Sequence, residues 1–358
     1  MSKYAGRNKK MNGKERIMTA LNRGQPDRVP VWEMAFNSAP LFGIAAHYTD
    51  VKKLERPKGI NALSVIAREL DLDGITATTS SPWEKMDDKH LKDAMGVVYH
   101  ASEHGAPYPI DGPIKDTSDL KGYKIRPPQE ADFTMLDELR SRFPEKAIAF
   151  HMPATFKISW SLMGSMENLF IAYLTEPDFV HDLARLVTDH CLELVDIVFG
   201  KGADFIACEG DLAHNPGSLM SPKHYDEYIG PYHKEICERV HKNGGKIIKH
   251  SDGKLNPLIP GLLNAGFDGI HPIQPQNMDI GKTKKEYGDR ACILGNIDCS
   301  FLLVFESPEE VRKSVKETIE AAAPGGGYII SSSNSIHPGC KPENYIAMVE
   351  AAHEFGAY

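Results

Sequence analysis

Stripes of positive charge, paired cysteines and long apolar runs are all missing from this 358-residue chain. Its formal net charge is -8, so it lacks the many cations that a sequence-independent grip on nucleic acid requires. No stretch approaches the roughly 20 apolar residues of a membrane-spanning helix. We therefore expect neither nucleic acid nor a membrane among its partners.

Cysteine is present, but not in a pattern that suggests disulfides or a cysteine-rich zinc site. The six cysteines are scattered without CxxC spacing, which is typical of reduced thiols in a cytosolic enzyme. The basic segment 1–18 also lacks the apolar core and the small-residue cleavage site of a signal peptide. We expect a cytoplasmic protein.

Nucleotide-binding motifs are absent as well. Neither GxGxxG nor GxxxxGK[ST] occurs, so dinucleotide or ATP chemistry has no support. The Gly325–Gly327 run precedes the last predicted strand rather than following it, which excludes a phosphate loop there. Hydrophobic residues at 41% and charged residues at 25% are ordinary for a folded, water-soluble enzyme.

Apolar runs of four to six residues alternate along the chain with helical stretches of ten residues or more. Such alternation implies parallel strands joined by crossover helices. We predict an α/β fold with a single (β/α)8 TIM barrel over residues 1–358, after an N-terminal helical extension. Residues 80–132 form an excursion over the barrel mouth that contains a small hairpin. The eight predicted strands are Val29–Met34, Gly74–Thr78, Ala147–Met152, Asp204–Glu209, Lys246–His250, Gly269–Pro272, Cys292–Asn296 and Tyr328–Ser332. The predicted helices include Met166–Leu174, Pro177–Phe199, Pro222–Lys242, Asn256–Asn264, Pro308–Ala322 and Pro342–Phe355.

Polar side chains collect where five successive predicted strands end. Barrel enzymes place catalysis at this end, because the loops that follow the strands converge there. One acidic or amide residue at such a position commonly caps the next helix, but these loops offer two or three of mixed type. They are Glu209 and Asp211, His250 and Asp252, His271 and Gln274, Asn296 and Asp298, and finally Ser331, Asn334, His337 and Cys340.

The most specific subset of these residues is Glu209, His250, Asp252 and Cys340. Imidazole, carboxylate and thiolate together make a tetrahedral zinc set with one position left for substrate. The spacing alone leaves a second interpretation open, in which His250 is a proton donor or an anion ligand and Cys340 is inert.

Nearly the whole chain resembles the uroporphyrinogen decarboxylase superfamily, and within it the zinc-dependent corrinoid methyltransferases. The resemblance is carried by KERIMTALNRGQPDRVPV, PDFVHDLARLV, GADFIACEGD, GGKIIKHSDG, GFDGIHPIQP, LGNIDC and GGYIISSSNSIHPGCKPENYIAMVEAAHEFG. It implies a (β/α)8 barrel. True uroporphyrinogen decarboxylases have an Arg-rich segment after the first strand, where this chain has WEMAFNSAP without an arginine. A macrocycle with eight carboxylates would find no clamp in this loop.

The branch that uses coenzyme M resembles this chain at the metal. Its HxC pair and second Cys match His250, Asp252 and Cys340, with Asp252 standing where the first Cys would be. A carboxylate in place of a thiolate leaves more positive charge on zinc, which suits polarising an ether oxygen. Glu209 then completes the coordination, with Asp252 either a ligand or a partner of His250.

The resemblance therefore implies a zinc enzyme that transfers a methyl group from an aromatic methyl ether to the Co(I) corrinoid of a partner protein. Aromatic side chains near the first strand ends fit a small methoxylated ring. The expected catalytic residues are Glu209, His250, Asn296 and Asp298, and the expected substrate contacts are Trp32, Phe36, Trp83, His271 and Asn334.

Three other functions stay open at this stage. The chain could be a metal-independent decarboxylase related to uroporphyrinogen decarboxylase, a methylcobalamin:thiol methyltransferase, or a module that binds a small ligand without turnover. The density of ionisable groups at the strand ends disfavours the last. The sequence leaves a homodimer open and does not identify the methyl donor.

Overall fold

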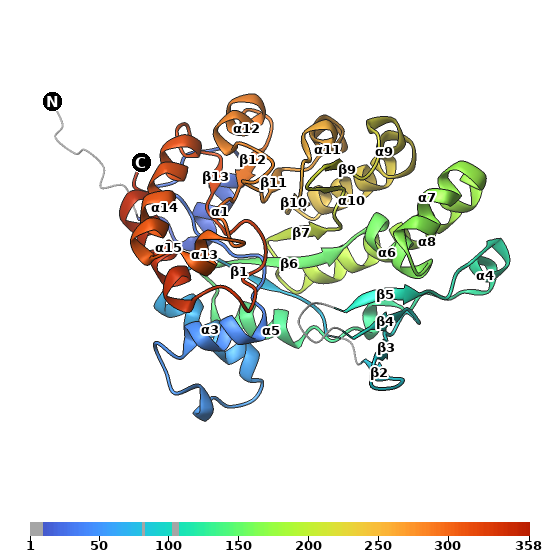
Figure 1. Ribbon diagram of the computed structural model, residues 1–358, viewed down its shortest axis with the longest axis horizontal. Helices are drawn as coiled ribbons and strands as arrows, with labels where there is room; N and C mark the ends of the chain where they lie inside the picture. Colours follow the sequence, from blue (N-terminus) through green and yellow to red (C-terminus); the bar gives the residue numbers. More distant parts are fainter. Residues whose placement is uncertain (1–9, 81–82, 102–106) are drawn as a thin grey trace. The chain divides into compact units, whose positions relative to one another are not determined.

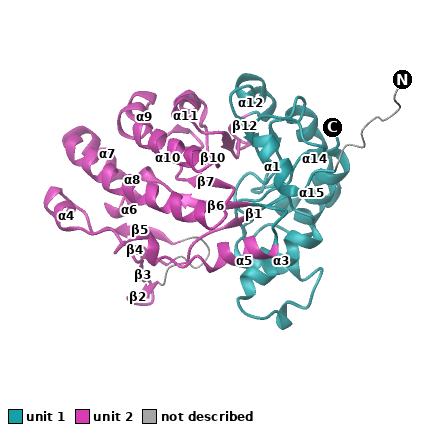
Figure 2. Ribbon diagram, turned by 180° about the vertical axis from the view of Figure 1, so that it is seen from behind, with its two compact units in different colours: residues 1–75, 143–147, 279–358 teal, residues 76–142, 148–278 magenta. Residues whose placement is uncertain are grey.

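The computed structural model describes residues 10–80, 83–101 and 107–358 (Figure 1). Contacts divide the chain into two compact units, coloured separately in Figure 2. Unit 1 takes in Met1–Ile75, Phe143–Ala147 and Asp279–Tyr358, and unit 2 takes in Thr76–Arg142 and Ile148–Met278. Each unit is assembled from segments that lie far apart in the sequence. The single domain over 1–358 stays a prediction.

The α/β fold class of the (β/α)8 barrel is confirmed, and a parallel ladder runs through unit 2. In it β7 (Phe205–Glu209) lies between β6 (Ala147–Pro153) and β10 (Lys246–His250), and β10 pairs in turn with β11 (Gly269–His271). These strands are rich in β-branched and aromatic residues and are mostly buried, as expected of strands covered on both faces. Every one of them was predicted to within two residues.

Unit 1 contains the strands from the two ends of the chain. There β12 (Cys292–Leu294) pairs with β13 (Tyr328–Ile329), and Val31 forms a parallel bridge with Ile330, just after β13. The Val31 carbonyl also accepts hydrogen bonds at the entry to β1 (Gly74–Ala77). The predicted strand Val29–Met34 thus lies between the last strand and the second, but only as isolated bridges, because Pro30 has no N–H to donate to a ladder.

Most predicted helices form with the expected bounds, and one prediction was wrong. The expected helix Pro222–Lys242 is two helices, α9 (Pro222–Tyr228) and α10 (Gly230–Lys242). Pro231 lacks an N–H, and its ring would clash with the carbonyl four residues earlier, so the chain breaks at Ile229. The other predicted helices are α7 (Met166–Thr175), α8 (Pro177–Gly200), α11 (Ile259–Ala265), α14 (Pro308–Ala322) and α15 (Pro342–Phe355). The predicted helix Asn256–Asn264 begins with the 3-10 helix η3 (Asn256–Leu258) before α11. Further helical segments are α2 (Ser38–Ala45), η1 (Val51–Lys53), α3 (Lys58–Glu69), η2 (Pro128–Glu130), α5 (Thr134–Arg142), α6 (Thr155–Leu162), α12 (Ile280–Tyr287) and α13 (Leu302–Phe305).

The excursion 80–132 is richer in structure than the small hairpin that the sequence predicted. It holds a four-stranded antiparallel sheet and the short helix α4 (Thr117–Gly122). Its residues 81–82 and 102–106 lie outside the described residues. The strands are β2 (Glu84–Lys85), β3 (His90–Lys92), β4 (Val98–His100) and β5 (Tyr108–Asp111), and a separate two-stranded ribbon follows β7 as β8 (Ala213–His214) and β9 (Gly217–Ser218).

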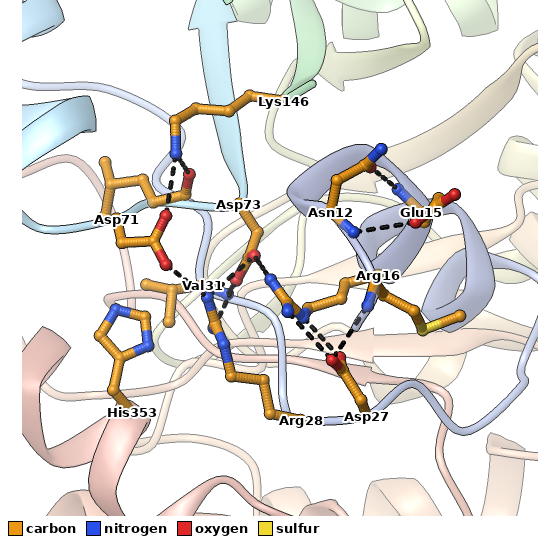
Figure 3. Close-up of polar contacts among 12 residues, drawn as sticks. Asn12, Glu15, Arg16, Asp27, Arg28, Val31, Asp71, Asp73, Lys146 and His353 are labelled. Atoms are coloured by element: carbon orange, nitrogen blue, oxygen red, sulfur yellow. Dashed lines mark hydrogen bonds and ion pairs between the residues drawn. The ribbon is translucent and has the colours of Figure 1, made fainter. Parts of the chain in front are cut away.

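A buried ion network secures the first helix, α1 (Gly13–Leu21), in unit 1 (Figure 3). Asp73 is 1% exposed and accepts hydrogen bonds from Arg16 Nη1 at 3.0 Å, Arg28 Nη1 at 2.7 Å and the Val31 N–H at 2.9 Å. Asp27 holds the other side of the Arg16 guanidinium. One carboxylate thus ties α1, the first strand segment and the entry to β1 together.

No helix among the described residues combines the length and the hydropathy needed to cross a membrane.

Candidate metal and substrate site

The ends of β7 and β10 bring the central polar groups of unit 2 together. These strands are parallel neighbours in register, Ala207 opposite Ile248, so their carboxyl ends finish side by side. The loops that follow are tied by two hydrogen bonds, from the Asp252 N–H to Asp211 Oδ1 at 3.0 Å and from the Leu212 N–H to Ser251 Oγ at 2.9 Å. The strand register and these two hydrogen bonds therefore place both loops at one edge of the sheet.

Asp211, His250 and Asp252 form a cluster whose possible ligand atoms all lie within 4.8 Å of one another. His250 Nε2 is 3.8 Å from Asp211 Oδ1 and 3.8 Å from Asp252 Oδ1. The imidazole is buried, whereas the Asp211 side chain is 45% exposed. A neutral nitrogen and two carboxylates make a ligand set suited to a divalent cation such as zinc.

The second ring nitrogen of His250, Nδ1, contacts another histidine. His250 Nδ1 lies 2.8 Å from Nδ1 of His271, which is fully buried. Burial, together with the nearby charges of Lys249 and His151, lowers the pKa of His250 to about 3. The ring is therefore neutral, and the tautomer that donates from Nδ1 to His271 is the one that would leave the Nε2 lone pair facing the two carboxylates.

Lys249 supports the same loops from inside unit 2. Its side chain is 1% exposed, and Nζ donates to the carbonyl oxygens of Gly210 at 2.6 Å and His250 at 2.8 Å. Gly210 has φ +128°, a conformation that favours glycine, and this turn separates Glu209 from Asp211. These hydrogen bonds from Lys249 hold the backbone from which the Glu209 and Asp211 side chains project.

A cavity of about 330 Å³ opens within unit 2 and reaches the end of β7 at Glu209. Its walls come from the excursion, the ends of β6 and β7, α6 and α8. Much of the lining is apolar or aromatic, as is usual for small-molecule sites. The lining residues used below are Trp83, Tyr99, Arg126, Phe150, His151, Lys157, His190, Leu194 and Glu209.

His151 and Glu209 form a pair at the cavity wall. His151 Nε2 lies 3.6 Å from Glu209 Oε2, and both side chains are 27% exposed. Burial lowers the pKa of His151, and the Glu209 carboxylate opposes that shift. His151 also acts electrostatically on His250, so this pair lies near the Asp211–His250–Asp252 cluster.

The predicted residues in unit 2 have distinct positions. His250 and Asp252 belong to the cluster, whereas Glu209 faces His151. Trp83 is 48% exposed, lines the cavity and contacts Tyr99 edge-on at 4.9 Å. The substrate contact of His271 and the ligand role of Glu209 stay predictions.

The predicted residues in unit 1 are Trp32, Phe36, Asn296, Asp298, Asn334 and Cys340. Trp32 is fully buried and Phe36 packs edge-on against Tyr345. Asp298 accepts hydrogen bonds from the N–H groups of Ser300 and Phe301. Asn296 and Cys340 are buried, Asn334 is half-buried, and burial raises the pKa of the Cys340 thiol to about 11. Their functional roles stay predictions.

Three residues of the site were not among the predicted site residues. Asp211 follows Glu209 at a predicted strand end, and His151 lies inside the predicted strand Ala147–Met152, so the strand pattern could have indicated both. His190 lies in the middle of the 24-residue helix α8, where an isolated histidine gives no signal. Only the three-dimensional path of the chain places it at the cavity.

Comparison with known proteins finds one family and one fold. A family model described as uroporphyrinogen decarboxylase (URO-D) matches residues 90–355. A uroporphyrinogen decarboxylase of Coxiella burnetii (strain Dugway 5J108-111) is 25% identical over 279 residues, 74% of each chain. One from Alkalilimnicola ehrlichii is 22% identical over 370 residues, 95% of this chain and 93% of the relative. A solved methyltransferase from Methanosarcina mazei has the same fold, with a TM-score of 0.72 and 21% identity over 96% of this chain and 99% of its own.

Proposed function

Because the chain belongs to the uroporphyrinogen decarboxylase family, we propose that it is a zinc-dependent methyltransferase of that family. It moves a methyl group from a methoxylated aromatic compound to the Co(I) corrinoid of a partner protein. The observation that carries the proposal is the Asp211–His250–Asp252 cluster, together with a cavity with aromatic walls in the same unit. The name of the similar solved protein, a methyltransferase, supports the same reaction type.

The cluster fits zinc in its donor chemistry. Catalytic zinc sites use three protein ligands of the imidazole and carboxylate type and keep one position for substrate. His250 is neutral, its Nε2 faces both carboxylates at 3.8 Å, and its Nδ1 is held by His271. A hydrogen bond at the second ring nitrogen of a ligating histidine commonly fixes the orientation of that ligand. Cys340, which the resemblance implies as a ligand, is tested by substitution, because the three cluster residues already leave only the fourth position for substrate.

Methyl transfer breaks the bond between the methyl carbon and the ether oxygen. The methyl group goes to Co(I), and the oxygen keeps the electron pair and takes up a proton. Zinc bound at the cluster would supply Lewis-acid stabilisation of the departing oxygen. We assign the proton transfer to the His151–Glu209 pair, in which the Glu209 carboxylate favours the protonated form of His151.

The cavity supplies orientation and keeps water away from the ring. Trp83, Tyr99 and Phe150 offer aromatic surface, and Leu194 adds an apolar wall from α8. Tyr99 is held in place because its hydroxyl donates to Asp93 Oδ2 at 3.1 Å. An aromatic ring bound among these groups gains both burial and edge contacts.

Porphyrinogen decarboxylation is the alternative that family membership favours most. A substrate with eight carboxylates needs several cationic partners, preferably guanidinium groups. The described residues that line the cavity offer Arg126 and Lys157, and Lys157 lies over the Trp160 ring at 4.1 Å. This small number of cations favours the neutral ether.

Zinc content and methylation of Co(I) cobalamin by 2-methoxyphenol test the proposal together. We expect one zinc per chain by elemental analysis, and an absorbance change that reports methylcobalamin. His250→Ala and Asp211→Asn should lose zinc and slow methyl transfer by more than about 100-fold, since each removes a metal ligand. Cys340→Ala tests the expected thiolate ligand separately.

The matched control is His47→Ala, because His47 is an exposed histidine of unit 1. It should keep both zinc and activity. Full activity in His250→Ala, or an active protein without metal, would overturn the proposal. Decarboxylation of a porphyrinogen without cobalamin methylation would replace it with the alternative.

A further inference from the structure

The cavity of unit 2 contains a polar atom that the proposed chemistry does not use. His190 lines the cavity from α8 and is 8% exposed, and its Nδ1 atom is buried without a hydrogen-bond partner. Among the described lining residues it is the buried side-chain nitrogen or oxygen that lacks one. A buried polar group without a partner destabilises a folded protein by about 1–3 kcal/mol. Such a group at a binding site indicates a ligand atom that completes it.

The surroundings of His190 determine which kind of ligand atom is missing. The backbone of Arg126 acts on the ring as a hydrogen-bond acceptor, and because Nδ1 has no hydrogen-bond partner we assign this contact to Nε2. The Arg126 acceptor in this bond is a carbonyl oxygen, so Nε2 carries the proton. Burial lowers the pKa of His190, which keeps the ring neutral. A neutral ring protonated at Nε2 presents a lone pair at Nδ1, which accepts a hydrogen bond.

The neighbouring groups leave this acceptor to the ligand. The Tyr99 hydroxyl already donates to Asp93, and the Lys157 ammonium lies over the Trp160 ring. Glu193, three residues after His190, accepts a hydrogen bond from Gln129 at 3.2 Å. Leu194, one helical turn further along α8, adds an apolar side chain to the same wall.

We infer that His190 Nδ1 accepts a hydrogen bond from a hydroxyl group on the aromatic ring of the methyl donor, so that the substrates are methoxyphenols rather than fully methylated arenes. The identity of the ring as a methyl donor rests on the proposed function. The preference for a hydroxyl group is a property of the cavity alone. It can therefore be measured without zinc, corrinoid or turnover.

Binding of matched small rings to the metal-free protein tests the inference. The probes are 2-, 3- and 4-methoxyphenol, which carry the hydroxyl at three positions, together with anisole, which has none. Titration calorimetry should show at least one methoxyphenol binding about tenfold more tightly than anisole, because it satisfies the buried nitrogen. Equal affinities, or no binding of any of the four rings, would overturn the inference.

Two variants of His190 distinguish the loss of the hydrogen-bond acceptor from a loss of folded structure. In His190→Gln the amide can replace Nε2 at the Arg126 backbone, but no acceptor remains at the position of Nδ1. We expect the preference over anisole to fall to about onefold to twofold while anisole binding is kept. His190→Asn places its amide near Nδ1 and should keep part of the preference. A full preference in His190→Gln would contradict the inference.

Methyl transfer measured in parallel distinguishes the two proposals. A preference that depends on His190, without any methylation of cobalamin, would refute the proposed function and leave this inference standing. Methylation that proceeds equally from anisole and from the methoxyphenols, with equal binding, would refute this inference alone.

Discussion

The histidine pair at the ends of β10 and β11 is the most sharply defined feature at the scale of single residues. His250 Nδ1 and His271 Nδ1 are 2.8 Å apart, and both rings are buried. A partner of this kind fixes the tautomer and orientation of a metal-binding imidazole. The pair therefore predicts that His271 affects metal binding without touching the metal.

His271→Phe should weaken zinc binding by about 10–100-fold, the usual effect of losing the partner of a ligating histidine. Competition with a chromophoric chelator measures the dissociation constant. His233→Phe is the matched control, because His233 is also a buried histidine of unit 2 but bonds the Tyr225 hydroxyl. Equal zinc affinity in both variants would contradict the assigned role.

Glu33 makes a second prediction at this scale. Burial raises its pKa to about 8, although hydrogen bonds from Ser332 and Met34 oppose the shift. The folded protein therefore keeps this proton up to about pH 8, whereas the unfolded chain releases it near 4.5. The contribution to stability is complete below the lower value and is lost as the pH rises through the upper one.

Glu33→Gln should remove that part of the pH dependence. Between pH 5 and pH 9 the free energy of unfolding of the wild type should fall relative to that of the variant, because only the wild type has this carboxyl group to ionise. Urea unfolding at several pH values measures the difference. Parallel curves for the two proteins would show that Glu33 does not titrate in this range.

At the scale of elements, the loop after β10 depends on one glycine. Gly253 has φ +82°, and a Cβ there would lie 2.4 Å from the backbone nitrogen of His214. Its N–H also donates to Gln274 Oε1 at 2.7 Å. Any larger residue must push this loop away from the β8–β9 ribbon, and Asp252 moves with it.

Gly253→Ala should therefore weaken zinc binding by about tenfold or more, in the range caused by misplacing a ligand's support. Gly244→Ala is the matched control, since Gly244 has φ +77° but nothing within 4 Å of the added Cβ. Backbone strain should lower the free energy of unfolding of both variants, but only Gly253→Ala should lose metal affinity. Loss in both would attribute the effect to strain alone.

At the scale of the whole molecule, the Asp73 network joins three segments of unit 1 (Figure 3). Asp73→Ala leaves the guanidinium groups of Arg16 and Arg28 without their shared partner. Removing one partner of a buried ion pair destabilises a protein by about 3–5 kcal/mol. Urea unfolding should show this loss.

The control for that experiment is Asp88→Ala, because Asp88 is 96% exposed and pairs only across the surface with Lys85. Its effect should stay within about 1 kcal/mol. A similarly small effect for Asp73→Ala would show that the network contributes little to stability.

Local sequence patterns were enough to predict most strand positions and two of the three members of the Asp211–His250–Asp252 cluster. Apolar runs and their polar ends are properties of neighbouring residues, so β10 was predicted with its observed bounds, and His250 and Asp252 at its end. The break between α9 and α10 also has a local cause, Pro231. The apolar periodicity that continues across this proline nevertheless led to the prediction of a single helix.

Tertiary structure decided which strand-end groups meet. The register of β7 on β10 brings Asp211 to His250, whereas Glu209 faces His151 across the cavity wall. The position of His190 at a cavity lined partly by the excursion depends on segments far apart in the chain. Because such contacts depend on the three-dimensional path of the backbone, the spacing of residues along the sequence could not reveal them.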